Sequence, residues 1–514
     1  MDMFGGLTKT SSRIAIAAAL GMTLGGFAMG ASPAKAADLG GDCCADLEER
    51  VAELEATTVR KGNKKVSVTL SGWVVDSINW WDDGRNNGFA VGSKDITLAS
   101  HFTISGSATI APGWTGGYNI TIEAPGNAFG FFSNQFNANS GTNAGGALAG
   151  AFGNYLDNVL QSYMWLKSDR YGTINWGLLS PATDNVALLP DLSGTIIESN
   201  AVLFEGPGFF LSANGTHASG TNTLQALTWS NFTHCDSVAP IAAGIGTDCN
   251  TSLPVNAVRY DSPTFWGFSI STSAAEQQTY DVAVKYAADW WSNWKVSAAF
   301  GYTKQLDENY GFGTALQVGP CNSVFGCGFK RDDDTFEVGA SIMHVPSGLW
   351  LYGMYQAIDI NGTNKVVGFG GISANTLGSA SNDSSSWFLK GGIKRTWTPL
   401  GATVIWGEGG QYINQFSGIA GTDICALGAE LATGSVGGAC ASGDSLFVTG
   451  STVNRVGAGV LQEIDSAAMH VYARWQQLNL DTTTAAFTGF GVPTKGNESF
   501  RDLNIFQVGG VIFF

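Results

Sequence analysis

Charged residues are scarce in this chain of 514 residues. Asp, Glu, Lys and Arg make up 13% of it, about half the ~25% that is usual in soluble domains, whereas hydrophobic residues make up 44%. A water-soluble protein of this size needs a more strongly charged surface. Proline is scarce as well, with 13 residues against 69 glycines, which excludes a disordered Pro/Gly-rich chain. The composition therefore favours a folded protein with much lipid-facing surface.

Long apolar runs are missing beyond residue 36, where no segment has 18 consecutive apolar residues. We therefore predict no transmembrane helix in the mature chain. The apolar run at 14–30 follows Lys9 and Arg13 and precedes the small-x-small sequence at 34–36. These features predict a signal peptide over residues 1–36. A membrane anchor is the alternative, but the run is at the short limit for spanning a bilayer.

The chain has an acidic balance and lacks the familiar catalytic motifs. Its net charge is −16, and removing residues 1–36, which hold three bases and one acid, makes it −18. This acidity argues against nucleic acid as a partner. No HExxH, CxxC or phosphate-binding glycine loop is present, and no His has the surroundings of a hydrolase triad. We expect no enzymatic activity, no cofactor and no metal. The histidines are His101, His217, His234, His344 and His470.

The eight cysteines are grouped. Cys43 and Cys44 are adjacent, and the other six form three close pairs in Gly-, Asn- and Ser-rich stretches between strand patterns. In an oxidising compartment such pairs favour loop-closing disulfides, with unpaired thiols as the alternative. The candidate pairs are Cys235 with Cys249, Cys321 with Cys327, and Cys425 with Cys440.

Residues 37–65 differ from everything after them. Within this stretch residues 46–58 are charged and glycine-free, and Leu47, Val51 and Leu54 have the 4-3 spacing of a coiled-coil seam. Two heptads are too short to be stable alone. We predict a short periplasmic coiled-coil helix that is stabilised by oligomerisation, followed by a basic linker. An ordinary surface helix is the alternative.

From Val66 onward the hydrophobic period becomes two. In residues 96–110 Phe102 and Ile104 share one face, whereas Thr103 and Ser105 share the other. Alternation over about 10 residues is typical of a transmembrane strand with lipid outside and water inside. Strands of a β-sandwich alternate too, but they are usually ~5–6 residues long. The fold class predicted is therefore all-β, a transmembrane antiparallel β-barrel over residues 66–514.

Short and long connections alternate along residues 66–514, and the predicted long ones include 81–94, 180–253 and 481–500. Each of seven short turns joins two strands, and strands at 66–80 and 503–514 complete a total of about sixteen. Short periplasmic turns, long external loops and an even count are what an outer-membrane barrel requires. Tryptophans at or beside five of the turns favour the membrane–water interface. The short turns are near 111–114, 168–171, 261–264, 288–293, 345–348, 398–401 and 463–465.

The last strand ends on an aromatic residue. Phe514 shares a face with Ile512 and Val508, which we predict to contact lipid. A terminal Phe on such a strand resembles the signal that the outer-membrane barrel assembly machinery reads. An edge strand at the chain end is unpaired unless it pairs with the first strand, which closes the barrel.

Several segments together carry a family resemblance. CADLEERVAELEATTVRKGNKKVSVTLSGWV, WWDDGRNN, WGLLSPATDN, NAVRYDSPTFWGFSIS and the terminal VGGVIFF resemble the general porins of alphaproteobacteria. The match runs from about Cys44 to Phe514. The resemblance implies a 16-stranded trimeric porin with a constriction loop folded into the lumen.

Charged residues predict where the constriction lies. The longest loop, 180–253, carries Asp184, Asp191, Glu198 and Glu205 and no Lys or Arg. We interpret it as the acidic side of a constriction; a lipopolysaccharide-facing loop that binds divalent cations is the alternative. A base on the lipid face near the midplane costs about 2–4 kcal/mol, so bases within strands are expected to line the pore. They are Arg259, Lys285, Lys390, Lys394, Arg455 and Arg474.

The sequence thus predicts an outer-membrane porin for passive diffusion of ions and small hydrophilic solutes. A substrate-selective barrel channel and a structural or adhesive barrel are the alternatives. The expected partners are outer-membrane lipid and lipopolysaccharide, the barrel assembly machinery, and further copies of the chain in a homotrimer.

Overall fold

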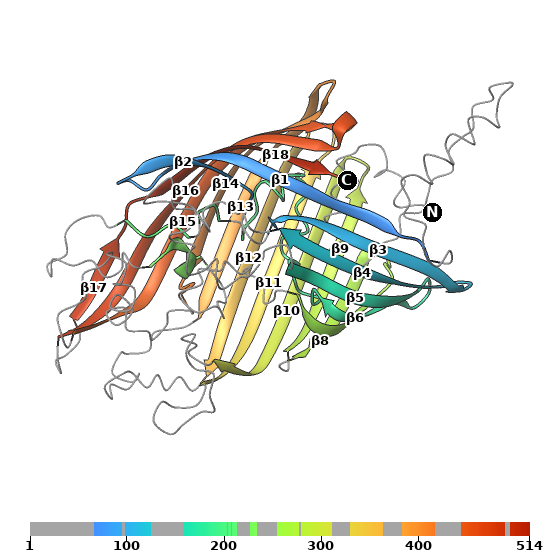
Figure 1. Ribbon diagram of the computed structural model, residues 1–514, viewed down its shortest axis with the longest axis horizontal. Helices are drawn as coiled ribbons and strands as arrows, with labels where there is room; N and C mark the ends of the chain where they lie inside the picture. The colour runs from blue at the N-terminus through green and yellow to red at the C-terminus, as the bar shows by residue number, and fades with distance from the viewer. Residues whose placement is uncertain are drawn as a thin grey trace.

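The computed structural model describes most of residues 66–514 as one barrel of strands (Figure 1). The described ranges are 66–94, 98–124, 158–202, 204–206, 208–212, 227–233, 254–276, 279–310, 329–362, 383–416, 444–488 and 494–514. The predicted signal peptide, the coiled-coil segment over 37–65 and all eight cysteines lie outside these ranges. Those predictions stay predictions.

Eighteen strands form a single antiparallel sheet. β1 pairs with β18 on one side and with β3 on the other, which closes a ring of sixteen strands when β2 and β17 are left aside. The predicted closed barrel and its strand number are thereby confirmed. The strands are β1 (Thr69–Asp82), β2 (Asn87–Gly92), β3 (Ser100–Ala111), β4 (Trp114–Ala124), β5 (Asn158–Ser168), β6 (Gly172–Leu179), β7 (Val255–Asp261), β8 (Phe268–Ala275), β9 (Thr279–Trp290), β10 (Trp294–Tyr310), β11 (Phe329–His344), β12 (Leu349–Gly362), β13 (Ser384–Thr398), β14 (Gly401–Ile413), β15 (Asp444–Ile464), β16 (Met469–Thr488), β17 (Thr494–Ser499) and β18 (Leu503–Phe513).

β2 and β17 correct the predicted external loops. We expected long loops at 81–94 and 481–500. Instead, β2 pairs with residues 77–82 at the end of β1, and β17 pairs with residues 481–486 near the end of β16. Both strands are only six residues long, which is too short for period-two alternation to be recognised in the sequence. The seven short turns lie where the sequence places them, and only two short 3-10 helices are described, η3 (Trp229–Asn231) and η8 (Asp465–Ala467). None of the described helices is long and apolar enough to cross a membrane.

Alternation along the strands separates a lipid face from a lumen face. On β1 the side chains of Val74, Ile78 and Trp80 are exposed, whereas Val75 and Asn79 are fully buried. Five tryptophans near short turns are exposed on the outer surface, in line with an interfacial aromatic belt. They are Trp114, Trp266, Trp290, Trp291 and Trp397.

Trp350 is an exception to the expected aromatic belt. It lies beside a short turn, but it is 4% exposed and packs in the lumen together with Tyr352 and Met354. Its position in the alternation of β12 directs the side chain into the lumen, where burial among other apolar side chains stabilises it.

The C-terminal residue takes part in closing the barrel. The N–H group of Phe514 donates to the carbonyl oxygen of Gly72 at 3.1 Å, and the N–H group of Gly72 donates back to Phe514 at 2.9 Å. The ring of Phe514 is 52% exposed on the lipid face, beside Ile512 at 50%. The predicted lipid-facing phase of the last strand is confirmed; recognition of Phe514 by the assembly machinery stays a prediction.

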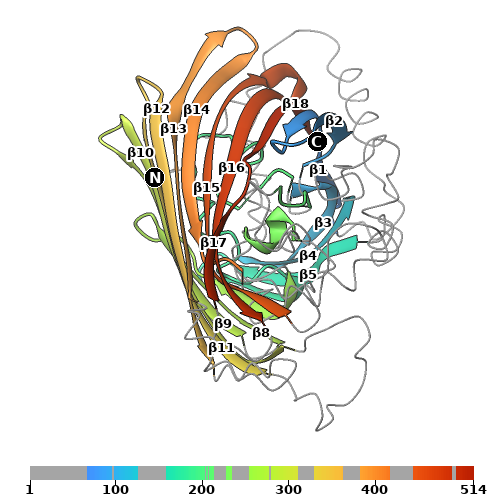
Figure 2. The ribbon, with the colours of Figure 1, turned by 90° about the vertical axis from the view of Figure 1, so that its left-hand side faces the viewer.

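A segment of the predicted constriction loop lies inside the ring of strands. Figure 2 shows it in green between the blue strands and the red ones. We call the described residues between 180 and 233 the lumen segment. Its apolar side chains share two buried cores with the lumen faces of β12–β16, β18 and β1. Members from the segment include Leu188, Ile197, Val202, Phe204, Phe209, Leu211 and Trp229.

The two halves of the wall differ in chemistry. On β12–β16, β18 and β1 the lumen face is mainly aromatic and aliphatic, and the lumen segment covers it. On β3–β11 the buried inward residues are mainly polar, including Thr103, Thr121, Gln161, Asn175, Ser271, Ser273, Thr303 and Thr335. An apolar wall is stable inside a barrel only where protein covers it. The apolar lumen face is accordingly the one that packs against apolar side chains of the lumen segment.

Candidate functional site: the lumen segment and the charged wall

The lumen segment begins with a polar attachment to β5 and β7–β9. Arg259 donates from Nη1 to the carbonyl oxygen of Ser180 at 3.0 Å. Asp281 accepts a hydrogen bond from the N–H group of Thr183 at 3.0 Å and another from the N–H group of Ser273 at 2.8 Å. Gln161 on β5 donates to the Ser180 hydroxyl at 2.9 Å. The start of the segment is therefore fixed to the wall at several points.

Further along, Glu408 on β14 joins three elements. Its Oε1 atom lies 2.7 Å from Nη2 of Arg455 on β15 and 3.2 Å from Nη2 of Arg474 on β16. Its Oε2 atom accepts from the indole of Trp406 at 3.0 Å and from the hydroxyl of Ser199 in the lumen segment. One carboxylate thus binds two wall strands to the segment.

Glu205 and Glu198 make the neighbouring contacts. Glu205 lies 2.8 Å from Nζ of Lys94 and 3.1 Å from Nη1 of Arg474. Glu198 lies 2.7 Å from Nδ1 of His470. Burial alone raises the pKa of the Glu205 carboxyl, but the charges of Lys94 and Arg474 lower it below its ordinary value. Glu205 is therefore ionised at neutral pH.

Lys390 on β13 holds the middle of the segment. Its Nζ atom lies 2.6 Å from Asp191, and it donates to the Thr195 hydroxyl at 2.9 Å and to the carbonyl oxygen of Ser199 at 2.6 Å. All three donor positions of the ammonium group are thereby used, which a buried lysine requires.

These residues form one buried cluster with equal numbers of acids and bases. We call it the wall cluster, and none of its side chains is more than 1% exposed. Opposed charges in direct contact neutralise one another, so the cluster fastens the segment to the wall. Its members are Lys94, Lys390, Arg455 and Arg474 with Asp191, Glu198, Glu205 and Glu408.

A second charged group surrounds the start of the lumen segment, and we call it the anchor cluster. Arg259 lies 3.0 Å from Asp261. Burial raises the pKa of Asp184 to about 6. Lys285 is half-buried, and among the described residues it makes no hydrogen bond or ion pair. The members are Arg259, Lys285, Asp184, Asp261, Asp281 and Glu337.

The predicted site residues therefore divide into three groups. Asp191, Glu198, Glu205, Lys390, Arg455 and Arg474 meet in the wall cluster, and Asp184, Arg259 and Lys285 meet near the segment's start. Lys394 lies apart and pairs with Glu463 at 2.6 Å. The bases lie in the predicted inward phase. A role for any of these residues in selecting solutes stays a prediction.

Five charged residues of the two clusters were missed in the sequence. Four of them lie on the lumen face of a strand, and the same alternation that marked the bases also marks Glu408, Asp261, Asp281 and Glu337. Lys94 lies between β2 and β3 in a segment that we expected to be an external loop, so its pattern gave no signal.

The lumen segment approaches Gly339 on β11 closely, and this contact allows a test of how tightly the segment packs against the wall. A Cβ atom on Gly339 would lie 1.9 Å from the carbonyl oxygen of Ala187, which also accepts from the hydroxyl of Tyr352 at 2.8 Å. We expect Gly339→Val to push the segment off the wall and to cost about 1–3 kcal/mol, as overpacking does. The unfolding temperature of the purified barrel measures this.

Gly407→Val is the matched control. Nothing lies within 4 Å of a Cβ atom placed there, on the outer face of β14. Equal unfolding temperatures for the two variants would contradict the close seating of the segment at Gly339.

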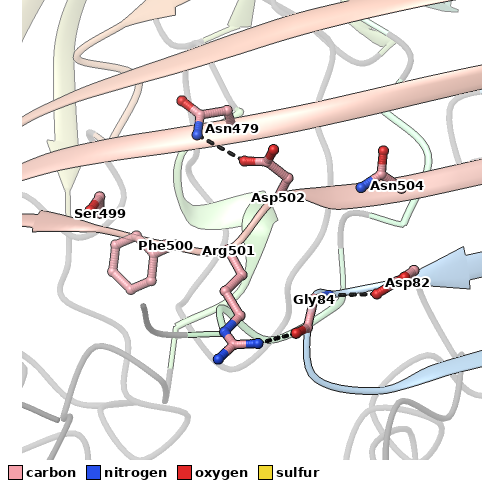
Figure 3. A pocket seen from close by; sticks show the side chains of 8 residues that line it. All are labelled: Asp82, Gly84, Asn479, Ser499, Phe500, Arg501, Asp502 and Asn504. Atoms are coloured by element: carbon pink, nitrogen blue, oxygen red, sulfur yellow. Dashed lines mark hydrogen bonds between the residues drawn. The ribbon is translucent and has the colours of Figure 1, made fainter. Parts of the chain in front are cut away.

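The described residues hold no group of three or more His, Cys, Asp or Glu side chains placed to bind a metal ion. A pocket of about 560 Å³ lies near the end of β1 and the start of β18, away from the short turns (Figure 3). Arg501 and Asp502 line it between β17 and β18, with Asn479 on β16 and Asp82 on β1. The N–H group of Arg501 donates to the carbonyl oxygen of Ser212 at 2.8 Å, which ties this part of the wall to the lumen segment.

The closed barrel with a segment folded into its lumen agrees with a comparison of the sequence with known families. Residues 15–410 match the family model described as Gram-negative porin. The chain belongs to the Gram-negative porin family. This porin is thus an outer-membrane channel for passive diffusion of small solutes, and the family is one of channels rather than enzymes.

Solved structures similar to the porin are distant in sequence. The anion-selective porin from Comamonas acidovorans is 14% identical, with a TM-score of 0.45 and coverage of 87% of this chain and 100% of that one. OmpT of Vibrio cholerae in its trimer form is 11% identical, with a TM-score of 0.42 and coverage of 88% and 100%. Salmonella typhi OmpF in complex with daunomycin is 13% identical, with a TM-score of 0.42 and coverage of 88% and 99%. No curated protein matches the sequence.

Proposed function

We propose that small hydrophilic solutes and ions cross this porin along the β3–β11 side of the lumen. The observation that carries the proposal is the contrast between the two halves of the wall. The start of the lumen segment is attached to β5 and β7–β11, and the rest of it shares two apolar cores with β12–β16, β18 and β1. The inward residues of β3–β11 are mainly polar, although buried, and a polar interior is typical of a barrel that holds a water-filled path.

Passive diffusion gives a simple expectation for transport. Liposomes that contain the porin should swell in isosmotic solutions of small neutral sugars, and the rate should fall steadily as the sugar grows. The rate should not saturate, because passive diffusion through a water-filled path requires no binding step. Saturation with one sugar would favour a substrate-selective channel, and the absence of swelling would favour a structural barrel.

We also propose that the porin assembles as a homotrimer. Three features support this: the family resemblance, the predicted heptads over residues 46–58, and a solved trimer form of OmpT of Vibrio cholerae. Crosslinking in outer membranes should capture a trimer, and capture of monomer alone would contradict the proposal.

We propose further that residues 1–36 are removed on export and that the three cysteine pairs close external loops as disulfides.

A further inference from the structure

Asp76 is an exposed carboxylate on the outer surface of the barrel. It points outward from the middle of β1, between Val74 and Ile78, which are 49% and 43% exposed. The other outward carboxylates among the described strand residues lie toward the external strand ends, as Asp82 does two positions beyond Trp80. Asp76 is therefore the one that lies within the apolar part of the outer surface.

A carboxylate at this level needs cover other than lipid. Ionised side chains within a membrane are costly and almost always face protein or water. Asp76 lies four residues from Trp80, which is about 13 Å along the strand at ~3.3 Å per residue. An aspartate side chain is too short to reach the polar surface from there. We therefore look for a protein surface that covers it.

The wall leaves Asp76 accessible from outside. Opposite it on β18 is Gly510, where a Cβ atom would have one backbone oxygen at 3.2 Å and otherwise open space. On the other side, β1 pairs with β3 up to Trp73 and with β2 from Ser77 onward, so residues 74–76 have no ladder partner there in the described part of the chain. Another polypeptide can thus approach the carboxylate closely.

β2 extends the same outer surface with two apolar side chains. Phe89 lies opposite Trp80, and Val91 lies opposite Ile78. They are 68% and 69% exposed, more than any other large apolar side chain of the described strands. An apolar surface with a polar group that bonds across to a neighbour is typical of protein contacts within a membrane. We call Val74, Asp76, Ile78, Phe89 and Val91 the outer face of β1–β2.

The position of the predicted heptads identifies the partner as a second copy of the chain. Residues 59–68 connect the heptads over residues 46–58 to the start of β1. A connection of ten residues spans at most about 33–36 Å. Copies that are joined through the heptads therefore hold their β1 strands close to the common axis, where the outer face of β1–β2 can meet a neighbour.

We propose that the outer face of β1–β2 is a contact between copies of this porin and that Asp76 accepts a hydrogen bond there from a donor group of the neighbouring copy. Protein then covers the carboxylate in place of lipid. A single polar contact within an apolar interface also fixes how the two surfaces are aligned. The inference rests on the proposed homotrimer.

Substitution of Asp76 tests its role in the contact. Asp76→Val should cause loss of the trimer in mild detergent at temperatures where the wild type keeps it, whereas Asp76→Asn retains an acceptor oxygen and should keep part of the trimer. The barrel itself should stay folded in both, because valine suits a lipid-facing position. Asp359→Val is the matched control: it removes an exposed carboxylate at the external end of β12 and should leave the trimer unchanged.

Access of lipid to the face gives a second measurement. A nitroxide is attached in the Ile78→Cys variant and, for comparison, in the Leu351→Cys variant on β12. The native side chains are 43% and 48% exposed in a single copy, so they are matched. In lipid bilayers, dissolved oxygen should relax the label at residue 78 much less than the label at residue 351. The unsubstituted porin is the control for its native cysteines.

Two results would overturn the inference while leaving the homotrimer in place. One is a trimer of wild-type stability in Asp76→Val, and the other is equal oxygen access at residues 78 and 351 in the trimer. Capture of monomer alone from the wild type would refute the proposed homotrimer together with this inference. Liposome swelling tests the channel separately, since it does not depend on the contact between copies.

Discussion

Replacing Glu408 by Gln is expected to lower the free energy of unfolding of the barrel by about 3–5 kcal/mol, the cost of removing one partner from a buried ion pair. Glu408 contacts Arg455 at 2.7 Å and Arg474 at 3.2 Å, and none of the three side chains is more than 1% exposed. A neutral amide removes the counter-charge that the two guanidinium groups share, and Arg474 keeps its contact with Glu205. Unfolding of the purified protein in a denaturant series measures the loss.

The same substitution should loosen the lumen segment. The hydroxyl of Ser199 donates to Glu408, so the variant weakens a contact between the segment and the wall as well as two between strands. We expect noisier single-channel current with transient higher-conductance states. Glu276→Gln, which removes an exposed carboxylate at the end of β8, is the control for the charge change. If Glu408→Gln is as stable and as quiet as Glu276→Gln, the wall cluster does not fasten the segment.

Much of the fold follows from period-two alternation. Exposed and buried residues on β1 and β18 have the predicted phases because lipid and lumen select opposite kinds of side chain at successive positions. Turn spacing gives the sixteen-stranded ring for the same reason, since short turns interrupt the alternation at regular intervals. β2 and β17 were missed because each is only six residues long, so the alternation does not extend far enough to be recognised.

The arrangement of the lumen was harder to predict. The acids of the loop and the bases of the wall were each found, but the sequence cannot give the distance between them. We expected them to face each other across open water, whereas Asp191 and Lys390 lie 2.6 Å apart. One signal was available: Trp350, Tyr352 and Trp406 occupy inward positions, and an inward aromatic face indicates that protein covers it.

The central claim is that solutes pass along the β3–β11 side of the lumen and not beside β12–β16. Two single cysteines separate these alternatives. Ser269 lies on β8 opposite Lys285 and is half-buried, and it is replaced in the Ser269→Cys variant. Ser386 lies on the inward face of β13 and is 1% exposed, and it is replaced in the Ser386→Cys variant. Single-channel current in a planar bilayer is recorded before and after a charged thiol reagent is added, with the unsubstituted porin as the control for its native cysteines.

The account predicts that the reagent lowers the current of the Ser269→Cys channel and leaves the Ser386→Cys channel and the unsubstituted porin unchanged. Covalent attachment of a charged group at residue 269 narrows the path and changes its field, whereas residue 386 is out of the reagent's reach. A block of the Ser386→Cys channel with no effect on Ser269→Cys would contradict the account, because it would place the path on the side that the lumen segment fills.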